Sequence, residues 1–209
     1  RNIVMEDRAA VVSLGPLTAG DKRPGASIAM MAGMGAQGAD YAGFLARYLD
    51  AANRAQAGTP LADQPGKVVK TYEAELFAWL ADKDNGLGFS GTADEAQAFF
   101  DALPAAQQRV FARQVYFAEL KAGGREYNDT DGARFGSYLR GRNAIAALFP
   151  EADAAGTPIR YRGDITMYGA AGVNTRFGGG IQMLTPGGAQ VFGIEGGAPV
   201  ARGGVTPGV

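Results

Sequence analysis

Helical periodicity is confined to the middle of this chain, and the two flanks carry only short strand-like runs between glycines. A helix repeats its apolar face about every 3.6 residues and a strand every second residue, so one segment cannot satisfy both periods. Glycine is also over-represented, with 32 residues, about twice the usual share, and is most frequent toward the ends. We therefore expect a mixed α and β protein in three segments, 1–36, 37–150 and 151–209, of which the middle one is helical.

Five amphipathic helices are predicted in the middle segment. Asp40 can cap the N-terminus of the first, Thr92 and Glu95 form a capping box for the third, and Pro104 suits the first turn of the fourth. Gly123-Gly124 is the expected end of the fourth helix, and the fifth is expected over about 133–148. The apolar positions that define the five helices are Tyr41, Phe44, Leu45, Tyr48 and Leu49; Val69, Tyr72, Leu76, Trp79 and Leu80; Ala96, Phe99, Phe100 and Leu103; Phe111, Val115, Ala118 and Ala122; Phe135, Tyr138, Leu139, Ile145 and Leu148. We interpret their aromatic side chains as core rather than as a cofactor site.

The flanks favour short strands joined by glycine-rich corners. Two stretches, 163–168 and 179–184, repeat one pattern in which Gly is followed by a small or acidic residue, Ile, a polar residue, Met and an apolar residue. The second copy begins 16 residues after the first (179 minus 163). Short strands that recur at a spacing of about 20 residues are typical of a solenoid, whose repeats bury their apolar faces against one another. A small β-sandwich is the alternative, and it would need longer strands and hairpin turns.

The composition excludes several classes of function. With 20 basic and 21 acidic residues, the net charge is -1, so no polyanion-binding surface is predicted and nucleic acid is not an expected partner. The absence of Cys and His removes the thiolate and imidazole groups that most metal sites and general bases use. We therefore expect no metal, no cofactor and no enzymatic activity. Because the chain opens on Arg1 and ends in a glycine-rich stretch, we also expect a fragment of a longer, processed polypeptide.

The tripeptide Arg162-Gly163-Asp164 allows two interpretations. As a motif it is a candidate ligand for cell-adhesion receptors, which requires an exposed, protruding loop. As local structure it is a corner that leads into a strand, with the Asp164 side chain accepting hydrogen bonds from backbone N–H groups. The repeated pattern that begins at Gly163 favours the corner.

Three further motifs invite a functional interpretation. Residues 33–38 match G-x-G-x-x-G, but the helix predicted after them leaves no second strand for a dinucleotide fold, so we interpret the glycines as a turn. Asn128–Gly132 resembles a Ca²⁺ loop only superficially and is interpreted as a polar connection between helices. The acids Glu151, Asp153 and Asp164 support the alternative of a glycan-active enzyme, which would need two carboxylates about 5–10 Å apart in a groove.

Two long stretches of the chain resemble the filamentous haemagglutinin family of large bacterial exoproteins. They are the strand pattern "RGDITMYG…GGGIQMLTPGG" and the helical block "ALPAAQQRVFARQVYFAELKAGGREY…GSYLRGRNAIAALFP". The likeness is greatest to a C-terminal domain of uncharacterised function in one branch of that family, in which a helical block interrupts the repeats. It extends from about Ser27 to about Gly197 and carries over no catalytic residues.

The resemblance implies a right-handed parallel β-helix whose rungs, at 1–36 and 151–209, continue one another around the inserted helical subdomain. It also implies two-partner secretion through a dedicated outer-membrane pore protein and an adhesin-like role at the bacterial cell surface. The expected function is thus a rigid shaft with a helical knob that attaches to a host or neighbouring cell, with glycans among the targets, or that self-associates.

Overall fold

The computed structural model describes residues 1–16, 20–35 and 38–194 of the 209-residue chain. Contacts divide the chain into two compact units. The β unit consists of Arg1–Gly38 and Ala152–Val209, and the helical unit consists of Ala39–Glu151.

All strand pairing in the described part of the β unit is parallel. The strands are β1 (Ile3–Met5), β2 (Ala10–Ser13), β3 (Ile28–Met31), β4 (Ile165–Tyr168), β5 (Gly172–Thr175), β6 (Ile181–Leu184) and β7 (Gln190–Ile194). They form a three-stranded sheet in the order β1-β4-β7 and two two-stranded sheets, β2-β5 and β3-β6. Every strand that precedes the helical unit therefore pairs with one that follows it, as in the register of Ile3 with Ile165.

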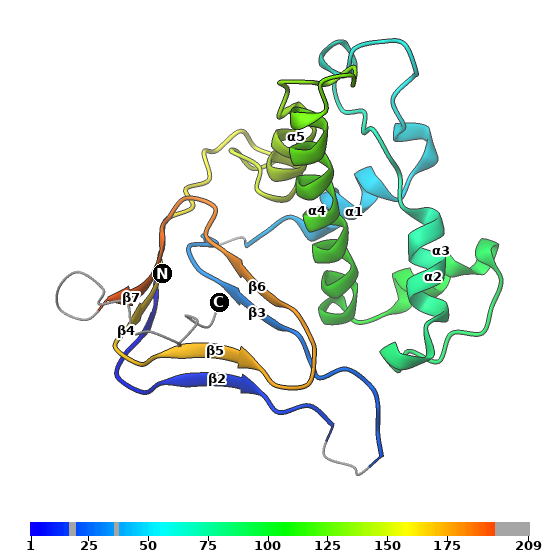
Figure 1. Cartoon of the computed structure of the whole chain (residues 1–209). Helices are drawn as coiled ribbons and strands as arrows, with labels where there is room; N and C mark the ends of the chain where they lie inside the picture. The colour runs from blue at the N-terminus through cyan, green and yellow to red at the C-terminus, as the bar shows by residue number, and fades with distance from the viewer. Residues whose placement is uncertain (17–19, 36–37, 195–209) are drawn as a thin grey trace. The chain divides into compact units, whose positions relative to one another are not determined.

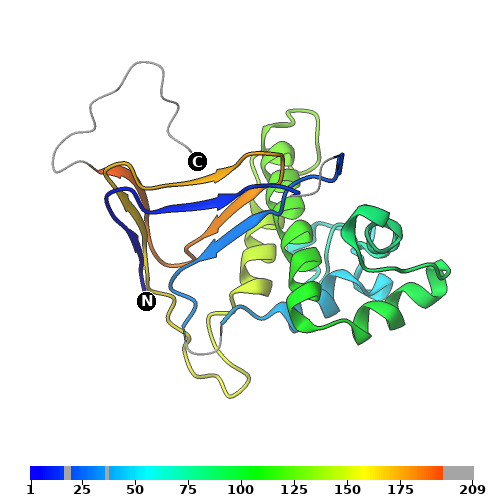
Figure 2. The same cartoon turned by 90° about the horizontal axis from the view of Figure 1, so that it is seen from below.

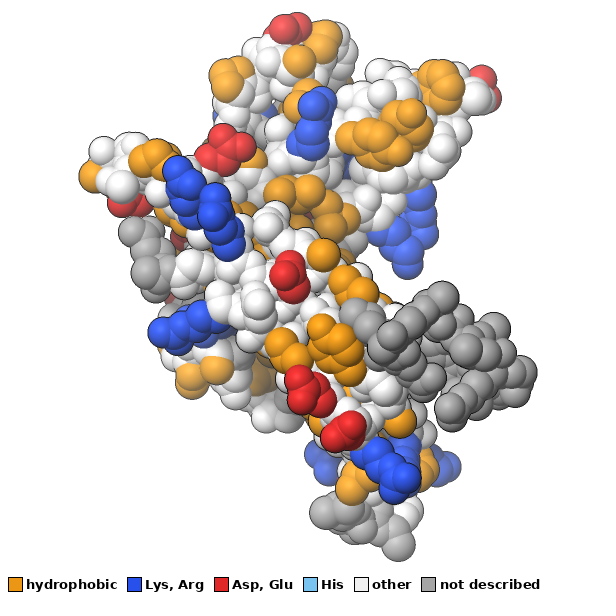
Figure 3. Space-filling model, turned by 90° about the vertical axis from the view of Figure 1, so that its left-hand side faces the viewer, with side chains coloured by type: hydrophobic (Ala, Val, Ile, Leu, Met, Phe, Trp, Pro, Cys, Tyr) orange, Lys and Arg blue, Asp and Glu red, His pale blue; other side chains and the backbone are white. Residues whose placement is uncertain are grey.

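The three sheets, which Figures 1 and 2 show from two directions, enclose one apolar cluster of side chains. Alternate residues of β4 explain the arrangement: Ile165 and Met167 are buried, whereas Thr166 and Tyr168 are more exposed. Val173 from β5 and Met30 from β3 join the same cluster. On the outer face of β1, Val4 is 51% exposed, and hydrophobic side chains also reach the surface on the side of the molecule that Figure 3 shows.

The predicted β-helix solenoid is wrong, because the strands form short parallel sheets of two or three strands rather than a stack of repeated rungs. A solenoid needs about three or more stacked repeats, and two of the three sheets have two strands within the described residues. The two copies of the Gly-to-Met pattern, interpreted above as successive rungs, lie in different sheets, at β4 and β6. The two copies share a residue pattern, but their 16-residue spacing (179 minus 163) does not place one copy on top of the other. Of the predicted fold, the structure agrees only with the mixed α and β class.

The helical unit packs around a core of aromatic and leucine side chains. Its elements are α1 (Tyr41–Tyr48), η1 (Ala51–Asn53), η2 (Leu61–Asp63), α2 (Glu73–Ala81), η3 (Lys83–Asn85), α3 (Ala93–Ala102), α4 (Ala105–Asn128) and α5 (Leu139–Leu148). The largest fully buried apolar side chains of this core are Tyr48, Phe44, Phe100, Phe111, Leu76, Leu80 and Leu148. The two ends of the unit are tied together, since Asp40 N donates to Leu148 O at 2.9 Å.

Two helix-start signals are confirmed. The carboxylate of Asp40 accepts from Gly43 N at 2.8 Å at the start of α1. The capping box is present at α3, where Glu95 Oε2 accepts from Thr92 N at 2.8 Å. These signals act within one turn of a helix, so local sequence is sufficient to find them.

Three helix boundaries differ from the prediction. The α2 helix begins at Glu73, so Val69 and Tyr72 precede it. The α4 helix runs through Gly123-Gly124 to Asn128, because Gly123 is buried where α4 meets α5. A Cβ on Gly123 would lie 3.0 Å from Gly141 N, so the glycine serves the close approach of two helices and not a helix end. The α5 helix begins at Leu139 rather than near 133, which leaves Phe135 and Tyr138 outside it.

Candidate functional site

Three aromatic residues lie at the α4–α5 connection of the helical unit, and two of them are exposed. The rings of Tyr127 and Tyr138 are stacked, with centroids 3.9 Å apart and an interplanar angle of 9°. Tyr138 is 53% exposed and Phe135 is 57% exposed. We refer to Tyr127, Phe135 and Tyr138 as the aromatic surface. Exposed aromatic side chains of this kind commonly mark a site of interaction.

The connection between α4 and α5 folds back so that the rings of Tyr127 and Tyr138 meet. Phe135 N donates to Gly132 O and Gly136 N donates to Tyr127 O, both at 3.0 Å. The positive φ of Gly136, 71°, is a conformation that glycine adopts without strain. The backbone therefore brings the far end of the loop next to the last turn of α4.

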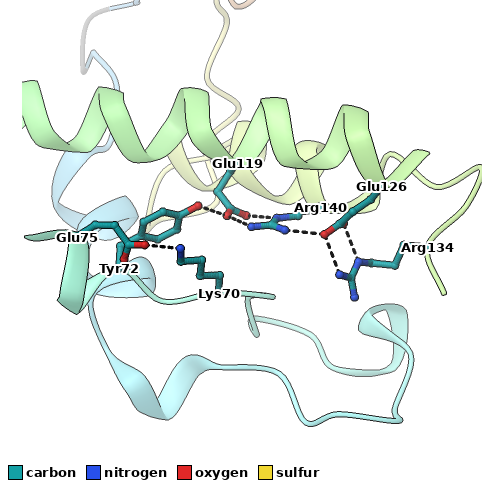
Figure 4. Close-up of polar contacts among 7 residues, drawn as sticks. All are labelled: Lys70, Tyr72, Glu75, Glu119, Glu126, Arg134 and Arg140. Atoms are coloured by element: carbon teal, nitrogen blue, oxygen red, sulfur yellow. Dashed lines mark hydrogen bonds and ion pairs between the residues drawn. The ribbon is translucent and has the colours of Figure 1, made fainter. Parts of the chain in front are cut away.

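Ion pairs hold the loop to both helices. Arg134 forms a bidentate ion pair with Glu126. Its Nε donates to Glu126 Oε2 at 2.6 Å and its Nη2 donates to Glu126 Oε1 at 2.8 Å, which joins the loop to α4. Arg140 Nη1 donates to the same carboxylate at 2.6 Å. Glu126 thus links α4, the loop and α5, and it fixes the backbone that carries the aromatic surface (Figure 4).

Arg140 continues this network into the core. Its Nε donates to Glu119 Oε2 at 2.9 Å, and Tyr72 Oη donates to Glu119 Oε1 at 2.5 Å. Glu119 is 1% exposed, so its charge is compensated inside the protein rather than by water. Burial, together with the hydrogen bond to Glu119, raises the pKa of Tyr72. Burial opposes the charge of Arg140, but Glu119 and Glu126 outweigh it and raise the pKa of Arg140.

The network predicts an acid-sensitive helical unit. Burial raises the pKa of Glu126, but the hydrogen bonds from Arg134 and Arg140 outweigh it and hold the pKa below its ordinary value of 4.5. The stabilisation from Glu126 is therefore complete above pH 4.5 and is lost as pH falls through the lower pKa of the folded state. We expect Glu126→Gln to lower stability at pH 7 and to reduce its loss on acidification. Urea unfolding followed by circular dichroism at several pH values measures both effects, and an unchanged pH slope would contradict the assignment.

The structure places the tripeptide Arg162-Gly163-Asp164 at a corner of the β unit. Gly163 is buried, and a Cβ on it would lie 2.1 Å from Arg1 O and 2.7 Å from Gly33 N. Asp164 Oδ1 accepts from Ala189 N at 2.8 Å, while Asp164 N donates to Asn2 Oδ1 at 3.1 Å. Arg162 is exposed, and its carbonyl accepts from the N-terminal amino group of Arg1 at 3.0 Å. These contacts favour the structural interpretation of the tripeptide.

The three acids of the enzyme alternative lie in different local settings. Glu151 is exposed at the end of the helical unit. Asp153 Oδ1 accepts from Ala155 N at 2.9 Å and from Thr157 N at 2.8 Å, and Asp164 bonds to Ala189 as described above. Asp153 therefore satisfies backbone N–H groups in its own turn, and Asp164 satisfies the N–H of the residue before β7. Within the described residues, no group of three or more acidic side chains is arranged to hold a metal ion.

The remaining two motifs are turns. Gly33 has a φ of 71°, and a Cβ on it would lie 2.6 Å from Gly163 N, so two glycine backbones pack directly on each other. Residues 36–37 of the G-x-G-x-x-G motif lie outside the described residues. The Asn128–Gly132 stretch contains the last residue of α4 and the turn that leads to the aromatic surface.

Comparison with protein-family models, with curated proteins and with solved structures finds no match for this chain. Among the described helices, none has both the length and the apolar character that a membrane span requires. The aromatic surface is the site that sequence reasoning missed, because Phe135 and Tyr138 fall on the apolar positions of an extended α5 pattern. The signal available in the sequence was the pair Gly132 and Gly136 on either side of Phe135, which disfavours a helix there.

Proposed function

We propose that this chain is a non-catalytic attachment segment of a secreted bacterial surface exoprotein of the filamentous haemagglutinin type. In this proposal the aromatic surface binds glycans on a host or neighbouring cell. The secretion route, through an outer-membrane pore protein of the two-partner kind that acts on the full precursor, rests on the sequence resemblance described above. The observation that carries the proposed attachment is the pair of stacked tyrosines, together with an exposed phenylalanine in the connection between them.

The chemistry of the aromatic surface suits a sugar. A pyranose ring presents a face of C–H groups, which packs on an aromatic ring, and a rim of hydroxyl groups that need polar partners. The ring of Tyr138 is exposed, and the stacked ring of Tyr127 holds it in place. The exposed side chains of Asp129 and Asp131 lie in the same connection and can hydrogen-bond to hydroxyl groups. Because the loop is already tied to α4 and α5, little ordering of the protein accompanies binding.

A glycan array and attachment to intact cells test the proposal. We expect the double variant Phe135→Ala/Tyr138→Ala to lower glycan affinity by about tenfold or more, since loss of about 1.4 kcal/mol of contact energy is a factor of ten. Val110→Ala, at an exposed apolar position of α4 outside the aromatic surface, is the matched control and should bind as the parent does. Asp164→Glu, which alters the tripeptide in the β unit, should also retain attachment. Full attachment by a folded Phe135→Ala/Tyr138→Ala variant would overturn the proposal.

Self-association is a second candidate function, and the edges of the β unit favour it. Within the described residues, β1, β2 and β3 each pair along one edge only, with β4, β5 and β6. Unpaired edges of extended strands readily add a strand from another chain. Sedimentation velocity over a range of concentrations tests this candidate. If the edges mediate assembly, Val11→Lys in β2 should shift the chain toward the monomer, whereas an unchanged size distribution would argue against edge pairing.

A further inference from the structure

The three-stranded sheet of the β unit ends in two different strands, β1 and β7. Each of them pairs with β4 along one edge, and among the strands that the structure describes the other edge of each has no partner. Proteins usually protect such an edge with a charged side chain or a proline. Neither Ile3–Met5 nor Gln190–Ile194 contains a charged residue or a proline. Both ends of this sheet can therefore accept another strand.

The exposed side chains of the two end strands lie in the same rows of the sheet. Val4 and Val191 are both in register with Thr166 of β4, one from each side. Val4 is 51% exposed and Val191 is 38% exposed, so each presents an apolar surface to solvent. Met5 and Phe192 share the neighbouring row in the same way, and Phe192 is 36% exposed. A β1 strand laid on β7 in this register would pack valine against valine and methionine against phenylalanine.

The lengths of the two strands also match. The β1 strand has three residues, Ile3–Met5. In β7, the residues from Gln190 to Phe192 follow the register of β4 without interruption. Beyond them the register shifts, because Tyr168 pairs with Ile194 and Gly193 is skipped. A shift of this kind bends a strand and interrupts its regular pairing, so the regular part of β7 has the length of β1.

The direction of the strands decides how two copies of the chain can meet. All pairing among the seven described strands is parallel. With the inner faces of both sheets on one side, two copies of β1 can meet only in antiparallel order, whereas β7 and β1 can meet in parallel order. We propose that β7 of one copy pairs in parallel with β1 of the next, so that the sheet β1-β4-β7 continues from copy to copy. This inference rests on the self-association proposed above and assigns a partner to the β1 edge.

The proposed contact joins two different surfaces and therefore leaves the assembly open. After two copies have met, one of them still has a free β1 edge and the other a free β7 edge, so further copies can add. Three paired residues bury much less than the roughly 1,200 Å² that a stable interface needs. We therefore expect weak association that increases with protein concentration.

Sedimentation velocity of the whole chain over a range of concentrations tests the proposal. We expect the parent to form species larger than a dimer as its concentration rises. In Val4→Lys/Val191→Lys, like charges would face each other across the contact, so this variant should stay monomeric where the parent assembles. Val4→Lys/Val191→Glu places opposite charges there and should assemble again, less strongly at high salt. Because both positions are exposed, both variants should unfold at the parent's temperature.

A third variant controls for added charge, and the outcomes separate this inference from the proposed function. Val110→Lys, at an exposed position of α4 in the helical unit, should assemble as the parent does. A parent that is monomeric at every concentration would overturn both this inference and self-association, while attachment through the aromatic surface would stand. If Val4→Lys/Val191→Lys assembled like the parent, or if Val4→Lys/Val191→Glu stayed monomeric, self-association would stand but the pairing of β7 with β1 would be overturned. Growth that stops at a dimer would also overturn it.

Discussion

Replacing Arg140 with Met is expected to remove a large part of the stability of the helical unit. The change leaves the Glu119 carboxylate, 1% exposed, with the Tyr72 hydroxyl as its partner but without the guanidinium that neutralises it. Removing one member of a buried ion pair typically costs about 3–5 kcal/mol, and whole domains are stable by only about 5–15 kcal/mol. Urea unfolding followed by helical circular dichroism should therefore show a much lower midpoint for Arg140→Met.

Two controls separate charge from packing in this experiment. Arg125→Met, at an exposed position of α4, should change the free energy of unfolding by no more than about 0.5 kcal/mol. The double variant Glu119→Leu/Arg140→Met should recover much of the lost stability, since it removes both buried charges. An Arg140→Met variant as stable as Arg125→Met would show that the network contributes little.

Adding one methyl group to Gly163 is expected to disrupt the corner of the β unit. The Cβ of Gly163→Ala would lie 2.1 Å from Arg1 O, 2.7 Å from Gly33 N and 2.8 Å from Gly33 Cα. All three are backbone atoms, so no side chain can rotate away, and β1 must shift from β4 or the Gly33 turn must move. Overpacking of this kind costs about 1–3 kcal/mol or more. Amide hydrogen exchange of β1 and β4 should accelerate accordingly.

Gly172→Ala provides the matched control for that substitution. Gly172 begins β5 in the same unit, and a Cβ on it would have no atom within 4 Å. Because alanine also restricts the unfolded chain, this variant should be neutral or stabilised by about 0.4–1 kcal/mol. Similar exchange rates in the Gly163→Ala and Gly172→Ala variants would contradict the close packing of Gly163.

Local signals in the sequence predict the helices better than the sheets, for a physical reason. The buried positions Phe44, Leu45 and Tyr48 follow directly from the helical period, because contacts three or four residues apart define a helix. The pairing of Ile3 with Ile165 joins strands separated by the whole helical unit, and no local pattern specifies it. The Gly-to-Met repeat was misleading for the same reason, since similar strands can belong to different sheets.

The candidate site depends on contacts that local sequence does not encode. Glu119 and Arg140 are 21 residues apart and meet only because Gly123 lets α4 and α5 approach closely. Phe135 and Tyr138 fit the apolar period of α5, yet the helix starts at Leu139 and leaves both exposed. In each case the tertiary arrangement decides whether a polar residue is buried or an aromatic residue is exposed.

The hydrogen bond from Asp40 N to Leu148 O has a consequence for the order of folding. The strands β1, β2 and β3 find their partners only after the whole of Ala39–Glu151 has been traversed. Closing an unstructured loop of about 110 residues costs about 4 kcal/mol of chain entropy, from (3/2)RT ln n. Once the helical unit has folded, its two ends are held together and most of that cost has already been met. Folding of the helical unit therefore brings together the two flanks that form the β unit. In a chain that is synthesised N-terminus first, the first strands stay unpaired until the second flank has been made.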